Sequence, residues 1–289
     1  MPLPLPTLSP ATCGLTGYAR LTFAPQGGRT RLTEAVTRPP LAVQRALYLD
    51  DASPDIATVF LLNTTAGLFQ GDRLRLEASA LPGGRVHLTT GSAAKVFTMP
   101  QGEARQETVL TVAPGALLEY LPDPLIPFQG SRFSQVNRLS VHPGGALLYG
   151  DVLTPGRVGM GEELLYSSYR HRLTLDDGQG GVQFHEAFEL RPGERPLERL
   201  GLLGKGGHTV MATLLAVLPE RADAFLSALQ ELLDGAPEVT GGAGPLPGGG
   251  VALRLMAPEA RMARRVLHAA WDAFRRTLYG TGAPNLRKY

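Results

Sequence analysis

The sequence predicts a mainly β protein, with layered or solenoid-like β-sheets followed by two α-helices near the C-terminal end. Three observations support this fold class. Short apolar runs cut by glycine and proline fill residues 14–218, and few of them are long enough for a helix. Similar proline–glycine turns recur within that region. Two longer stretches with helical periodicity follow residue 218.

Length and composition indicate a folded protein with a substantial core. The chain has 289 residues, 43% of them hydrophobic, and a formal net charge of +2. This charge gives no electrostatic footprint for nucleic acid. Cys13 is the single cysteine, which excludes an intrachain disulfide and a cysteine-based metal cluster. No secretory signal or membrane span is recognisable, so we expect a cytoplasmic protein with a flexible start over residues 1–13.

The strands are predicted from runs such as residues 59–62, 73–77, 109–112 and 146–149. Turns that begin at Pro82, Pro114 and Pro143 each precede a strand, and they recur about every 30 residues. Such a recurrence is typical of stacked sheets or of a solenoid. A set of unrelated hairpin turns is the alternative interpretation. Two further strands are predicted over residues 209–218 and 251–256, each ahead of a helix.

The two helices are predicted near residues 220–234 and 258–279, and glycines mark their ends. Each has an apolar stripe that we expect to face the core. Residues 235–250 between them are rich in glycine and proline, so a mobile surface loop is expected there. The face of the second helix opposite its stripe is basic and is expected to be solvated; it carries Arg261, Arg264, Arg265, His268, Arg275 and Arg276.

No motif for a metal site or an activated nucleophile stands out. The six histidines are scattered, without the close spacing that places two imidazoles on one helix face. Cys13 lies in a proline-rich start where nothing would activate its thiolate. Carboxylates are numerous, and a pair of them could support acid–base chemistry on a β scaffold. The sequence does not show which of them face one another; the candidates include Asp72, Glu119, Asp151, Glu162 and Glu186.

Two glycine-containing turns, residues 63–72 and 88–97, carry more polar residues than a connection requires. Asp72 is predicted to accept hydrogen bonds from the amides of its own turn. Asp72→Asn should then keep an acceptor and cost at most about 1 kcal/mol. Glu162 follows a glycine-broken segment with less obvious need for such a cap, so its charge is predicted to serve function rather than stability.

Taken in order, several segments resemble the urease accessory protein family UreD, called UreH in some organisms. They are residues 40–48, 63–72, 88–97, 118–122, 127–128 and 156–162, and residues 283–287 are similar to the family's C-terminal end. The resemblance implies a single β-rich domain over residues 14–289. It also implies a cytoplasmic, non-enzymatic scaffold or chaperone for assembly of the urease metallocentre. Its implied partners are urease apoprotein, a UreF-like accessory protein and a UreG-like GTPase, and its implied role is to assist nickel insertion.

The resemblance also marks candidate residues for partner contact or a metal conduit. These signature residues are Asn63, Gly67, Gly71, Asp72, Thr89, Thr90, Lys95, Glu119, Arg157 and Glu162. None is assigned as a catalyst, and no tightly bound cofactor is expected. Nickel in transit should meet sparse, weak ligands rather than a strong site that would trap it. Two alternatives stay open: a carboxylate-dependent β-fold hydrolase, and a nickel metallochaperone that acts alone.

Overall fold

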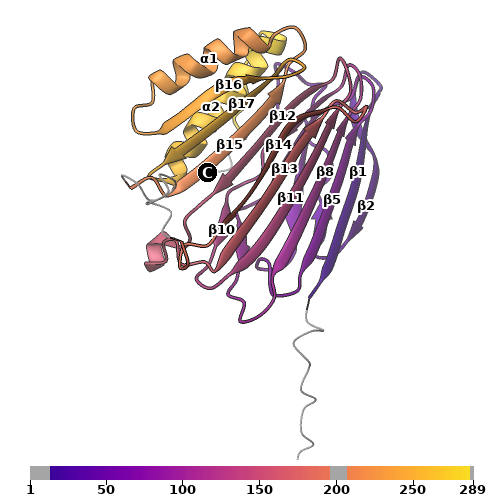
Figure 1. Ribbon diagram of the computed structural model, residues 1–289. Coiled ribbons are helices and arrows are strands. Elements are labelled where there is room, and N and C mark those ends of the chain that lie inside the picture. The colour runs from indigo at the N-terminus through magenta and orange to yellow at the C-terminus, as the bar shows by residue number, and fades with distance from the viewer. Residues whose placement is uncertain (1–13, 196–206, 287–289) are drawn as a thin grey trace, which may run out of the picture.

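The structure, a computed structural model, describes residues 14–195 and 207–286. Two β-sheets stack on one another, and two helices cover the side of the second sheet that faces away from the first (Figure 1). This arrangement confirms the predicted fold class. The segment over residues 1–13, for which flexibility is expected, lies outside the described residues.

The first sheet has seven strands in the order β14-β13-β11-β8-β5-β1-β2. Their bounds are β1 Thr16–Gln26, β2 Arg29–Arg38, β5 Arg73–Ala80, β8 Ala104–Val112, β11 Arg132–Val141, β13 Ser168–Asp176 and β14 Val182–Leu190.

The second sheet has ten strands, eight of them in the order β16-β17-β15-β12-β9-β6-β4-β3. Two short strands, β7 and β10, pair with each other, and β10 joins them to β12. The bounds are β3 Leu41–Val43, β4 Ala57–Asn63, β6 Arg85–Thr90, β7 Ala94–Val96, β9 Leu117–Tyr120, β10 Leu125–Pro127, β12 Ala146–Leu153, β15 Val210–Val217, β16 Thr240–Leu246 and β17 Gly250–Ala257.

The three recurring turns carry the chain from one sheet to the other. They join β5 to β6, β8 to β9 and β11 to β12, and successive strands pair in parallel within each sheet. Gly83, Gly115 and Gly144 have φ values of 73°, 69° and 82°, a conformation that glycine adopts without steric cost. The amide of Gly115 donates to the carbonyl of Gly144 at 3.0 Å, so neighbouring turns stack. The three turns are therefore equivalent corners of successive coils in a solenoid-like arrangement, and not unrelated hairpins.

Strand alternation assigns the side chains of the ten-stranded sheet to two separate cores. In β12, Leu147 and Tyr149 pack between the two sheets, whereas Leu148 and Val152 pack toward the helices. The same alternation in β6 and β9 decides which polar residues face the space between the sheets and which face the helices. Helices α1 (Ala222–Asp234) and α2 (Ala260–Tyr279) complete the second core. Neither helix of the described residues is long and apolar enough to cross a membrane.

Two expectations about the C-terminal region are wrong. Residues 240–246 form β16, which pairs with β17, where a mobile loop was expected. Glycine suits this strand because a Cβ at Gly241 would lie 2.6 Å from the carbonyl oxygen of Arg254. Arg275 is also not part of the solvated face of α2, since its side chain is only 1% exposed. It is buried because two carboxylates beneath the helix neutralise it.

Candidate functional site

A cavity of about 230 Å³ lies between the two sheets. It is lined by residues of both glycine-containing turns, 63–72 and 88–97, which we call the signature turns. Asn63 and Lys95 are exposed at its rim, whereas Tyr120 and Phe133 are buried deeper in its wall. The cavity therefore leads from the surface into the space between the sheets. Of the predicted candidates, it brings together Asn63, Gly67, Thr90 and Lys95.

The two signature turns touch where Gly67 of the first meets the backbone of Lys95 in the second, and only a residue without a side chain fits there. A Cβ at Gly67 would lie 2.4 Å from the carbonyl oxygen of Lys95, closer than real Cβ contacts come. The amide of Leu68 donates to that same carbonyl at 2.7 Å. Asn63 holds its own turn, because its Oδ1 accepts from the amide and the hydroxyl of Thr65 at 3.0 and 2.7 Å. These contacts fix the shape of the rim.

On the opposite wall of the rim, Thr90 and Asp123 form a reciprocal pair. The Thr90 hydroxyl donates to Asp123 Oδ2 at 3.1 Å, and the amide of Asp123 donates back to that hydroxyl at 2.7 Å. A carboxylate thus lies at the mouth of the cavity in a fixed position. Asp151 is the second carboxylate among the residues that line the cavity.

At the inner end of the cavity, Asp151 on β12 faces residues of the seven-stranded sheet. Its Oδ2 accepts from Gln135 Nε2 at 3.0 Å and lies 3.3 Å from Nε2 of His171. The other ring nitrogen of His171, Nδ1, lies 3.5 Å from Oε1 of Glu186 on β14. One imidazole is therefore held between two carboxylates from different sheets.

Burial and charge act in opposite directions on this group of residues. Burial lowers the pKa of His171, but its ionic contacts with Asp151 and Glu186 outweigh burial, and the pKa is raised above its ordinary value. Burial raises the pKa of Glu186, but His171 and Arg254 outweigh it, and the pKa is lowered. The arrangement thus favours a protonated imidazole beside an ionised Glu186.

From this point the polar side chains continue toward the surface at the far side. Arg254 on β17 forms an ion pair with Glu186. The side chains of His171, Glu186 and Arg254 are 2%, 22% and 35% exposed in that order. A line of polar groups therefore crosses the space between the sheets, from the rim near Lys95 to the edge near Arg254. In residues 14–195 and 207–286, no group of three or more His, Cys, Asp or Glu side chains is placed to hold a metal ion.

Asp72 and Gly71 lie outside this cavity, in the turn before β5. Asp72 is buried, and its two oxygens accept from the amides of Leu15 at 2.7 Å and Phe69 at 2.8 Å. Gly71 has a φ of 83°, which the turn requires. Asparagine at position 72 has a single acceptor oxygen, so the expectation that Asp72→Asn preserves the turn must be corrected: one of the two hydrogen bonds is lost.

Arg157 and Glu162 lie together beside the short 3₁₀ helix η2 (Val158–Met160). Glu162 accepts from the amide of Gln129 at 3.1 Å and from Arg157 Nε at 2.9 Å, and the Arg157 guanidinium stacks on Phe128 at 4.1 Å. The hydrogen bond from Arg157 is the main cause that lowers the pKa of Glu162. Glu162 therefore joins this loop to Gln129, just after β10, and the functional role of its charge stays a prediction.

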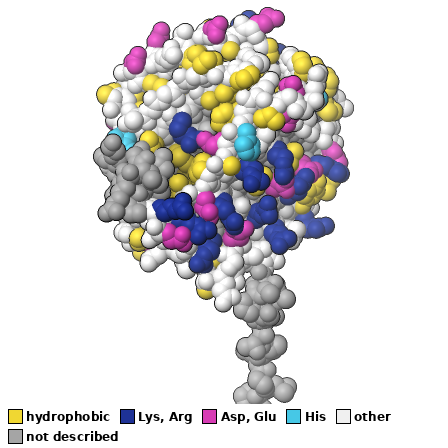
Figure 2. Space-filling model, in the orientation of Figure 1, with side chains coloured by type: hydrophobic (Ala, Val, Ile, Leu, Met, Phe, Trp, Pro, Cys, Tyr) yellow, Lys and Arg dark blue, Asp and Glu magenta, His cyan; other side chains and the backbone are white. Residues whose placement is uncertain are grey.

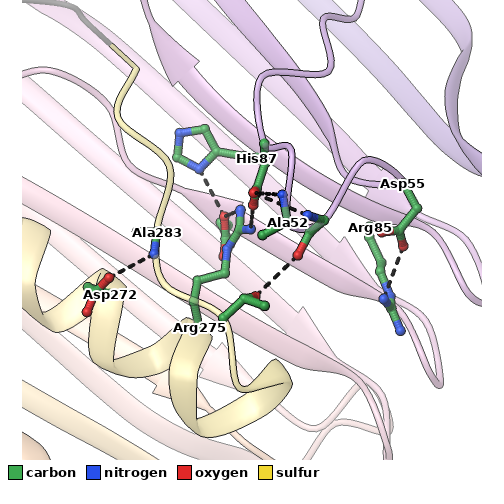
Figure 3. A network of polar contacts seen from close by, with 11 residues as sticks. Ala52, Asp55, Arg85, His87, Asp272, Arg275 and Ala283 are labelled. Carbon is green, nitrogen blue, oxygen red and sulfur yellow. Dashed lines mark hydrogen bonds and ion pairs between the residues drawn. The ribbon is translucent and has the colours of Figure 1, made fainter.

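Thr89 and Glu119 face the helices and not the cavity, as their strand positions require. The Thr89 hydroxyl donates to the carbonyl of Leu121 at 2.5 Å. Glu119 is fully buried; His87 Nδ1 lies 3.0 Å from its Oε2, and Arg275 Nη2 donates to the same oxygen at 2.7 Å. Arg275 also donates to Asp50 at 2.7 Å (Figure 3). Burial raises the pKa of Glu119, but the charge of Arg275 outweighs it and the pKa is lowered.

Sequence reasoning named Asp151 and Glu186 as carboxylates but did not pair them, and it left His171 and Gln135 out of the site. Their grouping depends on sheet register and on which strands face each other across the core. One usable signal existed. His171 lies between the inward-facing Tyr169 and Leu173, and Gln135 lies next to the inward-facing Phe133, in buried positions where a polar residue needs a partner.

Comparison with known proteins connects these features to one family. The family model for the UreD urease accessory protein matches residues 15–288. The urease accessory protein UreD 2 of Streptomyces griseus is 36% identical, over 98% of this chain and 97% of its own length. The UreD proteins of Photorhabdus laumondii and Cenarchaeum symbiosum are 30% and 31% identical, over 96% and 95% of this chain and 88% and 96% of their own lengths. The chain therefore belongs to the UreD family of urease accessory proteins.

Proposed function

We propose that this protein is a cytoplasmic scaffold for urease maturation. It binds urease apoprotein together with a UreF-like accessory protein and a UreG-like GTPase, and it assists nickel insertion into the urease active site. The observation that carries this proposal is the family match over nearly the whole chain. The similar proteins are named as accessory proteins and not as enzymes, which agrees with a non-enzymatic role. The hydrolase alternative is set aside on this ground.

The line of polar groups between the sheets supports a more specific role in passing nickel. The donors along it are oxygens of Asp123, Asp151, Gln135 and Glu186, together with the imidazole of His171 after it has lost its proton. Nickel is bound by imidazole and oxygen donors, and a cargo ion must be released as readily as it is taken up. Both nitrogens of His171 already face carboxylates. The contacts offered to a passing ion are therefore separate and weak.

The scaffold role is tested by deleting the protein from a strain that makes urease. Urease should still be synthesised but should contain little nickel and show little activity. Nickel content is measured on the purified enzyme, and a copy of the gene restored in the strain is the control. Normal nickel content after deletion would refute the scaffold role. Co-purification of a tagged chain with separately expressed partners then identifies which of them binds.

The role of the polar line is tested with Asp151→Asn in the restored gene. The change keeps the side-chain shape and one acceptor for Gln135, but it removes a negative charge from the inner end of the cavity. We expect lower nickel content in urease, measured at a temperature at which the variant is folded, because loss of the Asp151 charge also removes a partner of His171. Glu34→Gln is the matched control, because Glu34 forms an exposed pair with Arg20 on the outer face. Equal nickel content with both variants would rule out a role for the Asp151 charge.

A further inference from the structure

The outer face of the seven-stranded sheet carries many arginines (Figure 2). Rows of side chains run across the strands there, and most rows combine opposite charges. In one row, Arg75 on β5 lies opposite Glu107 on β8, with their charged atoms 2.6 Å apart. Arg138 on β11 also pairs with Glu107. Such cross-strand ion pairs contribute to sheet stability.

The neighbouring row breaks this pattern at β5 and β8. Arg73 on β5 is the direct register partner of Arg105 on β8, and the row continues through Ser134 and Arg170 to Glu189 on β14. Like charges placed directly opposite each other destabilise a sheet. In the part of the chain that the structure describes, neither Arg73 nor Arg105 has a carboxylate partner, and Arg172 on β13 has none either. The fold itself does not account for this row.

The surface is hollowed at the same place. A depression of about 400 Å³ has Ser134, Val136 and Ala187 among its lining residues. Arg105 and Arg172 also line it, as does Arg170 with its partners Glu103 and Glu189. Small side chains between long cationic ones leave room for a carboxylate to approach two guanidinium groups. We define the arginine patch as Arg73, Arg105 and Arg172, which lack a carboxylate partner among the described residues, unlike Arg170.

We propose that the arginine patch is a docking site for an acidic segment of a protein partner. The unneutralised cations supply the charge complementarity, and the depression between them accepts acidic side chains. A short acidic segment fits better than a nucleic acid, because the net charge of +2 gives the chain no broad electrostatic footprint for a long polyanion. The proposal rests on the proposed scaffold function only for the existence of protein partners.

The test measures binding of a short fluorescent peptide of alternating glutamate and serine to the purified full chain. The patch variant is Arg105→Gln with Arg172→Gln. The control is Arg261→Gln with Arg265→Gln, which removes the same charge from exposed positions on α2, 75% and 67% exposed. We expect the patch variant to bind about tenfold more weakly and the control to bind less than about twofold more weakly. The melting temperature of the patch variant should stay level or rise, because the repulsion between Arg73 and Arg105 is relieved.

Four results would overturn the proposal. The wild type does not bind the peptide at low salt, the patch variant binds it as tightly as the wild type, both variants lose the same affinity, or a labelled oligonucleotide binds the patch more tightly than the peptide. Nickel content of urease from strains that carry the same variants is measured separately. Docking is judged from peptide binding alone: a patch variant that binds the peptide like the wild type refutes it, whatever the nickel content of urease. Loss of nickel on deletion of the whole gene reports on the scaffold role alone.

Discussion

At the scale of single residues, the candidate carboxylates differ in what they contact. Asp72 and Glu162 accept hydrogen bonds from backbone amides of the chain, so their first role is to hold turns. Glu119 is enclosed with a buried arginine. Asp151 and Glu186 instead face a histidine inside the space between the sheets. Residue type and spacing could predict the turn-holding role of Asp72, but not these groupings, because they depend on neighbours far along the chain.

The histidine between these carboxylates makes stability depend on pH. The pKa of His171 is raised in the folded chain above its ordinary value of 6.5. Its contribution to the free energy of unfolding is therefore fully present below about pH 6.5 and is lost as the pH rises through the folded pKa. We expect the wild type to lose stability across this window and His171→Gln to lack that part of the slope. Urea unfolding at a series of pH values measures it.

The comparison of slopes separates this effect from simple destabilisation, because His171→Gln also lowers stability at every pH. His185→Gln is the matched control, since His185 is exposed on the outer face and contacts only Thr174 among the hydrogen-bond partners found. Its slope should follow the wild type. Parallel curves for the wild type and His171→Gln would show that this imidazole does not gain a proton on folding.

At the scale of elements, the sequence predicted most strands because apolar runs, turn glycines and their recurrence are local signals. The coils that begin at Pro82, Pro114 and Pro143 show this directly. It failed at β16, where glycines serve a close backbone approach and not flexibility. It also failed at Arg275, because helical periodicity places a residue on a face but does not reveal carboxylates on strands beneath it. Long-range pairing decided both cases.

The attachment of α2 to the ten-stranded sheet depends on that buried arginine. Arg275→Met leaves Glu119 and Asp50 buried without their cation. Removal of one partner from a buried ion pair costs about 3–5 kcal/mol, so we expect a loss of that order in urea unfolding. Arg276→Met, one residue further, removes an exposed arginine paired with Asp272 and should cost less than about 1 kcal/mol. Similar losses for the two variants would contradict the anchoring role of Arg275.

A double variant tests the cause of the loss. Arg275→Met combined with Glu119→Gln removes one of the two stranded charges and leaves His87 a neutral partner. It should recover part of the stability lost in Arg275→Met alone. If the double variant is less stable than the single one, packing of the arginine side chain and not charge would be the larger contribution.

At the scale of the whole molecule, two cores divide the polar residues between two tasks. The core between the sheets contains the cavity and the line from Asp123 to Glu186, whereas the core under the helices contains the network around Glu119. The sequence resemblance predicted the family and marked the rim residues Asn63, Gly67, Thr90 and Lys95. It did not predict that Thr89 and Glu119 face the helices and not the cavity. The face of each residue follows from the alternation of side chains along its strand.

This division predicts how the isolated chain behaves toward nickel. In residues 14–195 and 207–286 no cluster of ligands is placed to hold a metal ion, and the polar groups of the line are already paired with one another. A tight site needs several donors that converge on one point. We therefore expect calorimetry of the metal-free chain with nickel to show only weak binding, with dissociation constants on the order of micromolar or higher. His171→Gln should weaken this binding further, and His185→Gln should not. A nanomolar site with one ion per chain would instead favour a metallochaperone that acts alone, and would require ligands that this arrangement of the described residues does not provide.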